Sequence, residues 1–289
     1  MSKINDDFVV SVKNGDLETV QMLLEHGADV HAGNDEAFMA AFESGNETLL
    51  RCLFDHEKYC GRAKQWDFDK SLYWFYRIYD MKIPNYLLRK TGRRNGNEFD
   101  ANLYFLVLPH LSMKDGYALD YAYLYDSHHG GEPALFARPI DAIQQYWSSD
   151  DWSKWAENNH YLDYVVADGS PESFLELILL STMASHFYLF WHAQYMDTSV
   201  ITPDSVEDHV KDIFKKKYLK RDIRMQNDGL EILRPKVQLT DDIAMVTYCT
   251  FSEWKGIVLH KDSYNRLYPH KMVAKEESTL VEYDSGIDI

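Results

Sequence analysis

The apolar residues near the start of the chain follow a helical spacing, and the pattern occurs twice. Residues 8–27 (FVVSVKNGDLETVQMLLEHG) and 38–57 (FMAAFESGNETLLRCLFDHE) align with a period of 30 residues. In each unit, apolar positions three or four apart mark two short helices with a glycine between them. The glycine fits a helix terminator, and the residue after it, Asp16 or Asn46, fits the N-cap of the next helix. Because one such unit cannot bury its apolar faces alone, the pattern predicts stacked helical hairpins.

Beyond residue 98 the pattern changes to short strands. Segments 102–111, 116–126 and 133–139 are apolar and rich in aromatic side chains, which is typical of strands. Alternate positions of the second strand share one face: Tyr117, Leu119, Tyr121, Tyr123 and Tyr125. The segment 89–98 (RKTGRRNGNE) is basic, contains glycine and asparagine and has no large apolar residue. It is therefore taken as the boundary between a helical domain, 1–92, and a second domain, 93–289.

Helical spacing returns in the middle of the chain. The predicted helices span 140–147, 150–159 and 201–219, together with a long one that extends to residue 196. Ser170 fits the N-cap of the long helix and Pro171 its first position. Its segment 174–196 is long enough to cross a membrane. A buried core helix is predicted instead, because several side chains would be costly in hydrocarbon: Glu176, His186, His192 and Gln194.

Strands are predicted again towards the end of the chain, at 234–240, 242–251, 254–260 and 278–287. Strands, then helices, then strands follow one another without strict alternation. This order predicts an α+β domain built on a mostly antiparallel sheet.

Residues 14–32 (NGDLETVQMLLEHGADVHA) resemble an ankyrin repeat. The Gly-Asp-Leu-Glu start, the Leu-Leu-Glu-His-Gly-Ala-Asp-Val end and the following Ala stand in the family's order. The family's Thr-Pro-Leu-His opening is absent, and the period falls about three residues short of the family's. The resemblance covers residues 5–60, and a third, degenerate unit is predicted at 79–92, with Leu87 and Leu88 at the end of its helix. It implies that the concave face and the finger tips bind other proteins; the alternative is a helical cap that only packs against the rest of the chain.

Composition narrows the class of partner. The 289 residues carry a formal net charge of −16, which disfavours nucleic acid and anionic membranes and favours a basic or neutral partner. Apolar residues, at 45%, are sufficient for a packed core. The three cysteines match no metal spacing, and the start (MSKINDDFVV) lacks the pattern of a signal peptide. A reduced, cytoplasmic location is therefore expected.

The stretch 125–139 (YDSHHGGEPALFARP) holds the densest candidate chemistry. Its candidate catalytic residues are His128, His129 and Glu132, with Asp126 beside them. The two glycines fit a tight turn between strands, and adjacent histidines on extended backbone point apart. A zinc site needs three or four ligands. A hairpin turn is therefore favoured over an active-site loop or a metal site, and no metal or cofactor is predicted.

Arg138 is the distinctive member of this stretch. An arginine inside an apolar strand is expected to be half-buried, and Asp120 or Asp126 on the neighbouring strand is its predicted partner. The ion pair is expected to be structural, and the three residues are also candidates for binding.

A polar stripe is predicted on the long helix, where five side chains recur at spacings of four and three: Ser181, Ser185, Tyr188, His192 and Tyr195. The stripe would either line a cleft, with His192 as a titratable group and Ser185 and Tyr188 as binding residues, or form the less buried side of a core helix. The segment 211–224 holds seven basic residues against two acids. It fits a solvated helix face, an acidic partner or the chain's own acidic end, 276–289.

Two functions remain open. The first is a soluble interaction protein that binds another, basic protein through its ankyrin-like repeats and acidic surface. The second is a hydrolase whose site lies where the loop 126–138 meets the stripe 181–195. The sequence has no GxGxxG, Walker, GxSxG, HExxH or CxxC motif, and Cys249 fits a buried strand position better than a nucleophile. The interaction protein is therefore favoured over the enzyme.

Overall fold

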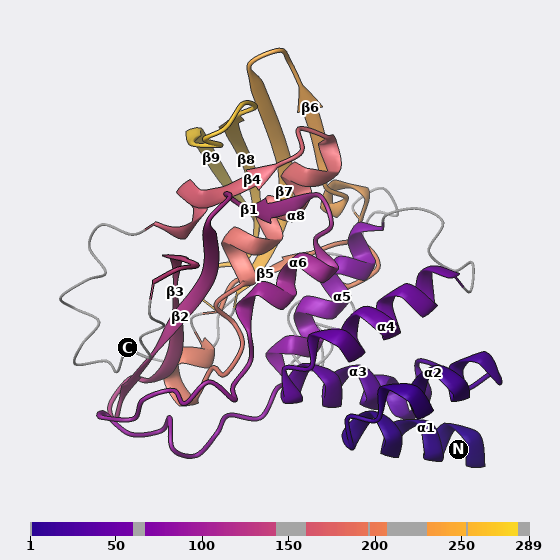
Figure 1. Cartoon of the computed structure of the whole chain (residues 1–289). Coiled ribbons are helices and arrows are strands. Elements are labelled where there is room, and N and C mark those ends of the chain that lie inside the picture. The colour runs from indigo at the N-terminus through magenta and orange to yellow at the C-terminus, as the bar shows by residue number, and fades with distance from the viewer. Residues whose placement is uncertain are drawn as a thin grey trace.

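The computed structural model describes residues 2–59, 67–142, 160–195, 197–206, 230–252 and 254–282. The fold belongs to the predicted α+β class, with a helical stack at the N-terminus and antiparallel sheets after it (Figure 1). The predicted helix 150–159, the basic segment 211–224 and most of the predicted helices 140–147 and 201–219 lie outside the described residues.

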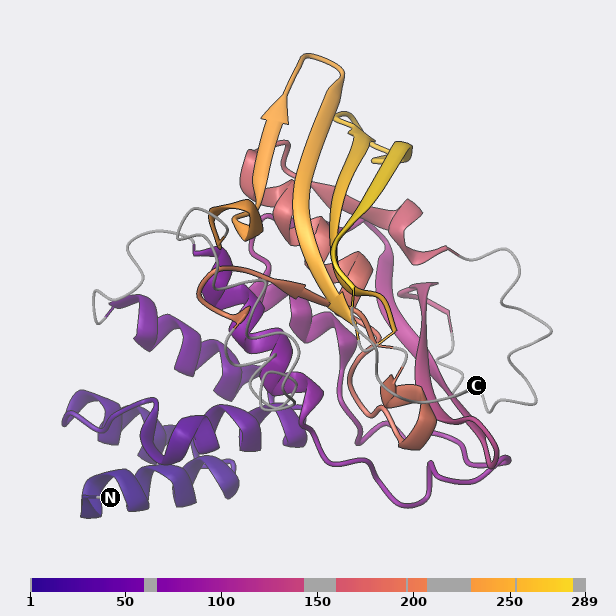
Figure 2. The ribbon, with the colours of Figure 1, turned by 180° about the vertical axis from the view of Figure 1, so that it is seen from behind.

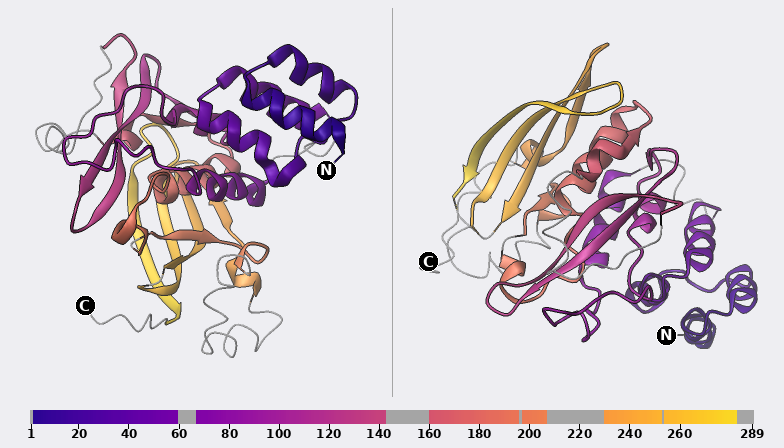
Figure 3. Two further views of the ribbon diagram at one scale, coloured as in Figure 1. Left: turned by 90° about the horizontal axis from the view of Figure 1, so that it is seen from below. Right: turned by 60° about the vertical axis from the view of Figure 1, so that its left-hand side comes forward.

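The N-terminal stack consists of two helical hairpins and a fifth helix. Its helices are α1 (Lys3–Lys13), α2 (Leu17–Glu25), α3 (Ala32–Ser44), α4 (Glu47–Tyr59) and α5 (Phe68–Tyr79). Helices α1, α3 and α5 lie in one row, and α2 packs beside α4 in a second row (Figure 3). The predicted caps are confirmed, since Asp16 accepts from the backbone of Thr19 at 3.1 Å and Asn46 from that of Leu49 at 3.1 Å. Gly15 and Gly45 have the left-handed backbone of helix terminators.

Helix α5 was missed by the sequence pattern, which placed a third helical unit at 79–92. The chain forms turns after Asp80, and Leu87 and Leu88 end no helix. Asp67 caps α5 by accepting from the backbone of Asp69 at 3.0 Å. Trp74 of α5 packs on Phe38 of α3, with ring centroids 4.3 Å apart. An aromatic surface therefore joins α5 to the hairpins.

A left-handed turn connects the two hairpins. Gly33, Asn34 and Asp35 have φ angles of 67°, 61° and 65°, so the regular part of α3 begins after them. Asp35 is buried, and its Oδ1 lies 2.6 Å from Nδ1 of His31. We refer to residues 33–35 as the finger turn.

Helix α8 (Pro171–Met183) lies between α5 and the C-terminal sheet (Figure 1). Ser170 caps it by accepting from the backbone of Ser173 at 3.1 Å, as predicted. The sheet has the order β5-β7-β8-β9, with β6 pairing with β7; its strands are β5 (Ser199–Ile201), β6 (Lys236–Leu239), β7 (Ile243–Ser252), β8 (Gly256–Asn265) and β9 (Met272–Val281). The last strand begins before the predicted 278–287, and all pairings are antiparallel. Seen from behind, this sheet rises away from α1–α4 (Figure 2).

The prediction that the long helix extends to residue 196 is wrong. Helix α8 ends at Met183, and Tyr188 and Trp191 both have a φ of 57°. Residues 191–195 then form a separate 3-10 helix. The turn after α8 places Phe187 among buried aromatic rings, 4.8 Å from that of Phe99. Burial of the Phe187 ring favours a turn over a continued helix after Met183, although the sequence has no glycine or proline there to end the helix.

A long hairpin forms the remaining side of the molecule, with β2 (Tyr117–Asp126) paired to β3 (Gly130–Pro139). A short pair, β1 (Leu111–Met113) with β4 (Val165–Ala167), lies beside it, and η3 (Tyr161–Tyr164) precedes β4. The strands predicted at 116–126 and 133–139 are therefore confirmed. The strand predicted at 102–111 is wrong, since η1 (Ala101–Leu103) and α6 (Tyr104–Val107) occupy most of it.

The reason for this error is tertiary packing. Tyr104 stacks on Phe75 of α5 with centroids 4.7 Å apart, and Ser71 of α5 donates to the carbonyl of Val107 at 2.9 Å. A short apolar run does not distinguish a strand from a buried helical turn. Packing on α5 decides the outcome here.

One apolar cluster extends from Phe8 in α1 to Tyr264 in β8, and it crosses residue 92. A smaller cluster lies on the other face of the C-terminal sheet, around Cys249 and Phe251. None of the helices in the described part of the chain has the length and apolar character needed to span a membrane.

Candidate binding groove along helix α5

The predicted loop 126–132 is an exposed hairpin turn. Asp126 organises it, because its Oδ1 accepts from the backbone of His128 at 2.6 Å and of His129 at 3.2 Å. These bonds lower the pKa of Asp126. The side chain of His129 is 85% exposed, and His128 and Glu132 are exposed too. Such side chains lack the exclusion of water that general acid–base catalysis gains in a pocket.

The turn contacts the segment after α8 through its glycines. Gly131 and Phe190 exchange two backbone hydrogen bonds, of 3.1 Å and 2.9 Å. A Cβ atom on Gly130 would lie 2.1 Å from the carbonyl oxygen of Phe190, so only glycine allows this approach. His192 comes two residues after Phe190 in the chain, but its side chain is exposed and lies against Trp191. The structure thus brings the loop and the 190–193 backbone together without enclosing their histidines.

Of the two predicted partners of Arg138, Asp120 and Asp126, the structure pairs it with Asp120. Arg138 Nε lies 2.9 Å from Oδ2 of Asp120, whose other oxygen lies 2.6 Å from Nη1 of Arg94. Arg94 comes from the segment expected to be a domain boundary, and it also covers the ring of Tyr121 at 3.5 Å. Arg94 could not be recognised from the sequence, because a basic loop without large apolar residues is usually exposed. The cluster fixes a loop to the hairpin, and the side chains of Arg94 and Asp120 are almost fully buried, which suits the structural role expected of the ion pair.

The polar stripe does not exist as a helical face, because α8 ends before Ser185. Ser181 donates locally to the carbonyl of Ile178 at 3.1 Å. Tyr188 is buried, and its hydroxyl accepts from the backbone of Phe99 at 3.2 Å. Ser185 is partly buried in the turn after the helix, and the side chain of Tyr195 lies outside the described part. The stripe was predicted from helical spacing, but the fold places its members in different elements and environments.

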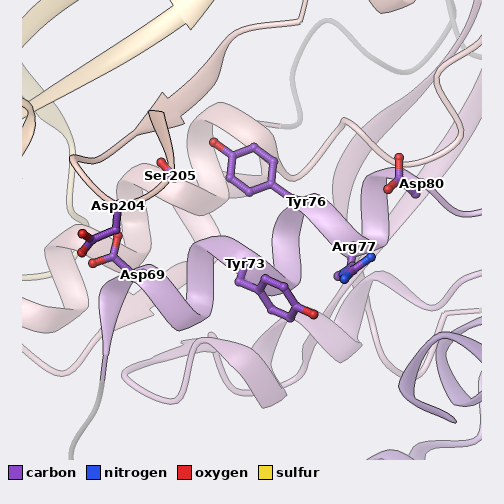
Figure 4. A pocket seen from close by; sticks show the side chains of 7 residues that line it. All are labelled: Asp69, Tyr73, Tyr76, Arg77, Asp80, Asp204 and Ser205. Carbon is purple, nitrogen blue, oxygen red and sulfur yellow. The ribbon is translucent and has the colours of Figure 1, made fainter. Parts of the chain in front are cut away.

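A groove lies along α5 instead. It encloses about 340 Å³ and is lined by Asp69, Tyr73, Tyr76, Arg77, Asp80, Asp204 and Ser205. The four lining residues of α5 and its C-cap residue Asp80 are spaced by four, three, one and three, so they share one face of the helix. The opposite faces of α5 are occupied by α3 and α8. Figure 4 shows Asp69 beside Asp204 at one end, Arg77 and Asp80 at the other, and the two tyrosines between them.

The segment 200–205 forms the wall of the groove at its acidic end. The hydroxyl of Tyr76 donates to the carbonyl of Val200, and that of Thr202 donates to a carboxylate oxygen of Asp69. Thr202 and Ser205 also exchange backbone-to-hydroxyl bonds of 2.8 Å and 3.2 Å, which orders the turn that carries Asp204. These bonds anchor the wall to α5.

Carboxylates are concentrated at the end of the groove around Asp69 and Asp204. Burial raises the pKa of Asp69, and the neighbouring carboxylates of Asp204 and Asp67 raise it further, while the bond from Thr202 opposes the shift. Burial also raises the pKa of the Tyr76 hydroxyl. Among the lining residues three carboxylates face one guanidinium, that of Arg77, while outside the lining the charge of Arg234 lowers the pKa of Asp69. A positively charged group would relieve the repulsion between the carboxylates.

The far end of the groove is connected to the finger turn through Arg77. Its Nη2 donates to Oδ1 of Asn34 at 2.8 Å and lies 3.6 Å from Oδ2 of Asp35. Its guanidinium also lies 5.0 Å from the ring centre of Tyr73. Arg77 therefore links the groove to the finger turn by a hydrogen bond and an ion pair.

Other potentially reactive side chains in the described residues are less suited to form an active site or a metal site. His260 and Cys249 belong to adjacent positions of neighbouring strands, where Tyr248 pairs with His260 and Cys249 with Leu259, so their side chains point to opposite faces of the sheet. Burial raises the pKa of Cys249 to about 12. Within the described ranges, no three histidine, cysteine, aspartate or glutamate side chains cluster as metal ligands.

Comparison of the chain with models of protein families, with curated proteins and with solved structures finds no match to any of them.

Proposed function

We propose that this chain is a protein-interaction module and that a partner chain lies in the α5 groove. The observation that carries the proposal is the groove itself, which is lined along one face of a core helix by a carboxylate, two tyrosines and an arginine. Elongated grooves of this kind suit a segment of polypeptide, and tyrosine is enriched where proteins bind one another.

The helical stack supports the same function. The N-terminal segment resembles ankyrin repeats, which bind partners with their inner helices and finger tips. Helix α5 extends the row of α1 and α3, and Arg77 connects its groove to the finger turn. Partner contacts would then extend from the groove onto the exposed residues Gly33 and Asn34 of the finger turn.

A capture experiment with matched variants tests this function. Full-length wild-type protein, Tyr73→Ala and Met22→Ala are used as baits in the same extract. Tyr73 is 37% exposed in the groove, and Met22 is 49% exposed on α2, away from it. A partner that Tyr73→Ala loses and Met22→Ala keeps supports the proposal, provided that circular dichroism shows both variants to be folded. Partners that both variants retain equally would contradict it.

A further inference from the structure

The chemistry of the groove indicates what kind of segment it accepts, and this inference rests on the proposed function. Its lining carries three carboxylates, and the one guanidinium among them already contacts Asn34 and Asp35. The whole chain has a formal charge of −16. Both the local and the overall charge therefore select a cationic occupant.

The acidic end suits a planar cation better than a point charge. Asp69 and Asp204 lie side by side there (Figure 4). The hydroxyl of Thr202 uses one acceptor position of Asp69, and each carboxylate offers about four. A guanidinium presents five donors in a fixed fork and can bond two carboxylates at once, which an ammonium does less well.

The middle of the groove adds aromatic faces. Tyr73 and Tyr76 lie between the two ends, and Tyr73 already has the guanidinium of Arg77 near its ring. Arginine on tyrosine is thus a contact that this surface makes within its own chain. A second arginine entering from a partner would meet the same kind of surface.

The length of the groove sets the spacing of the cations. Asp69 in α5 and Asp80 at its C-cap stand eleven residues apart, which corresponds to about 16 Å at 1.5 Å per residue. An extended peptide advances about 3.3 Å per residue, and its positions i and i+4 share one face about 13 Å apart. The side chains of two arginines at this spacing can reach both ends of the groove.

We propose that the groove binds an extended basic segment of a partner protein, with one arginine at Asp69 and Asp204 and a second, four residues away, at Asp80. The phenol rings of Tyr73 and Tyr76 cover the stretch between them. The hydroxyl of Thr202 holds the Asp69 carboxylate in place for the first arginine.

Binding of synthetic peptides to the full-length protein tests the proposal. The probe is a fluorescent nine-residue peptide of glycine and alanine with arginines four residues apart, and matched peptides carry lysine or glutamine in their place. The arginine peptide is expected to bind several-fold more tightly than the lysine peptide and at least about tenfold more tightly than the glutamine peptide. Its affinity should fall as salt is raised from 0.05 to 0.5 M (about 14 to 4 Å of screening length).

Isosteric variants locate the site. Asp69→Asn, Asp204→Asn and Asp80→Asn are each expected to weaken the arginine peptide about fivefold, and the Asp69→Asn/Asp204→Asn pair more than either alone. Asp55→Asn removes the same charge from an exposed position on α4 and should leave the affinity unchanged.

Two outcomes overturn the inference and are distinguishable from each other. If the glutamine peptide binds as tightly as the arginine peptide and both lose affinity in Tyr73→Ala, the groove binds polypeptide but the assignment of arginine is wrong. If no peptide binds, or if binding is unaffected by every groove variant, both the arginine anchor and the peptide-binding role of the groove are wrong.

Discussion

Arg94 Nη1 lies 2.6 Å from Oδ1 of Asp120, and both side chains are almost fully buried. The same carboxylate holds Arg138 on the neighbouring strand at 2.9 Å. One aspartate thus fixes the segment that follows the helical stack to the β2–β3 hairpin. The helical and sheet-containing parts of the chain are joined here by charge as well as by the apolar core.

Asp120→Asn is expected to lower the free energy of unfolding by about 3–5 kcal/mol. It leaves two arginines in a largely buried setting without their shared anion, and breaking a buried ion pair from one side costs about this much. Urea unfolding followed by circular dichroism measures the change. Asp115→Asn, which removes an exposed charge in the turn before β2, should stay within about 0.5 kcal/mol of wild type. Equal small effects in both variants would show that the Arg94–Asp120 pair does not stabilise the fold.

Comparing Gly130→Ala with Gly116→Ala distinguishes a steric clash of the new Cβ atom from the strain of a positive φ angle alone. Both glycines have positive φ angles, of 95° and 82°. A Cβ on Gly130 would meet the carbonyl of Phe190 at 2.1 Å, whereas nothing lies within 4 Å of one on Gly116. Gly116→Ala should cost about 1–2 kcal/mol and Gly130→Ala clearly more, about 3 kcal/mol or above. Similar losses of unfolding free energy would mean that the turn does not pack on residues 190–193 as described.

The sequence predicted those elements whose local pattern and tertiary contacts agree. The first two helical hairpins, with their glycine terminators and their Asp16 and Asn46 caps, are in this group, as are the β2–β3 hairpin and the start of α8. The sequence also predicted an acidic partner for Arg138 on the neighbouring strand, Asp120 or Asp126. The register decides for Asp120, because Arg138 pairs with Ala118, two residues from Asp120 on the same face of the hairpin.

The candidate groove could not be predicted in the same way. Helix α5 carries a recognisable signal, with Asp67 as its cap and apolar residues at helical spacing, but the aromatic run obscured it. The second wall, around Asp204, contacts α5 through bonds such as those of Thr202 and Tyr76, which join positions more than a hundred residues apart. The end of α8 at Met183 was likewise decided by burial of Phe187, for which the local sequence has no stop signal.

His186 is expected to make the protein less stable in mild acid. Burial lowers its pKa to about 4 from 6.5, so the unfolded chain takes up a proton before the folded one does. Its contribution is therefore fully present above about pH 6.5 and is lost progressively as the pH falls to about 4, by about 3 kcal/mol. His186→Phe should flatten this part of the pH profile of unfolding free energy relative to wild type. His128→Gln, at an exposed position, should leave the slope unchanged; parallel profiles for wild type and His186→Phe would refute the assignment.

Cys249 is expected to resist alkylation in the folded protein. Its side chain is buried, its thiol donates to the carbonyl of Ile232 at 3.6 Å, and its pKa is raised to about 12 from 9.0. The thiolate fraction at pH 8 is then about a thousandfold below that of an unperturbed cysteine. Iodoacetamide labelling followed by peptide mass spectrometry should modify the partly buried Cys52 before Cys249, and both in 8 M urea. Equally fast labelling of Cys249 in the native protein would contradict its burial between sheet and 3-10 helix η6 (Leu230–Leu233).

Site-specific photo-crosslinking tests most directly whether a partner segment lies in the α5 groove. A benzophenone side chain is placed at Tyr73 in the groove, at Met22 on α2 or at Leu267 in the β8–β9 turn, and each full-length protein is irradiated with the diarginine peptide. Crosslinks at position 73, mapped by mass spectrometry and suppressed by Asp69→Asn/Asp204→Asn, are the predicted result. Crosslinks that form equally at positions 22 or 267, or that persist unchanged in the double variant, would show that the groove is not the binding surface.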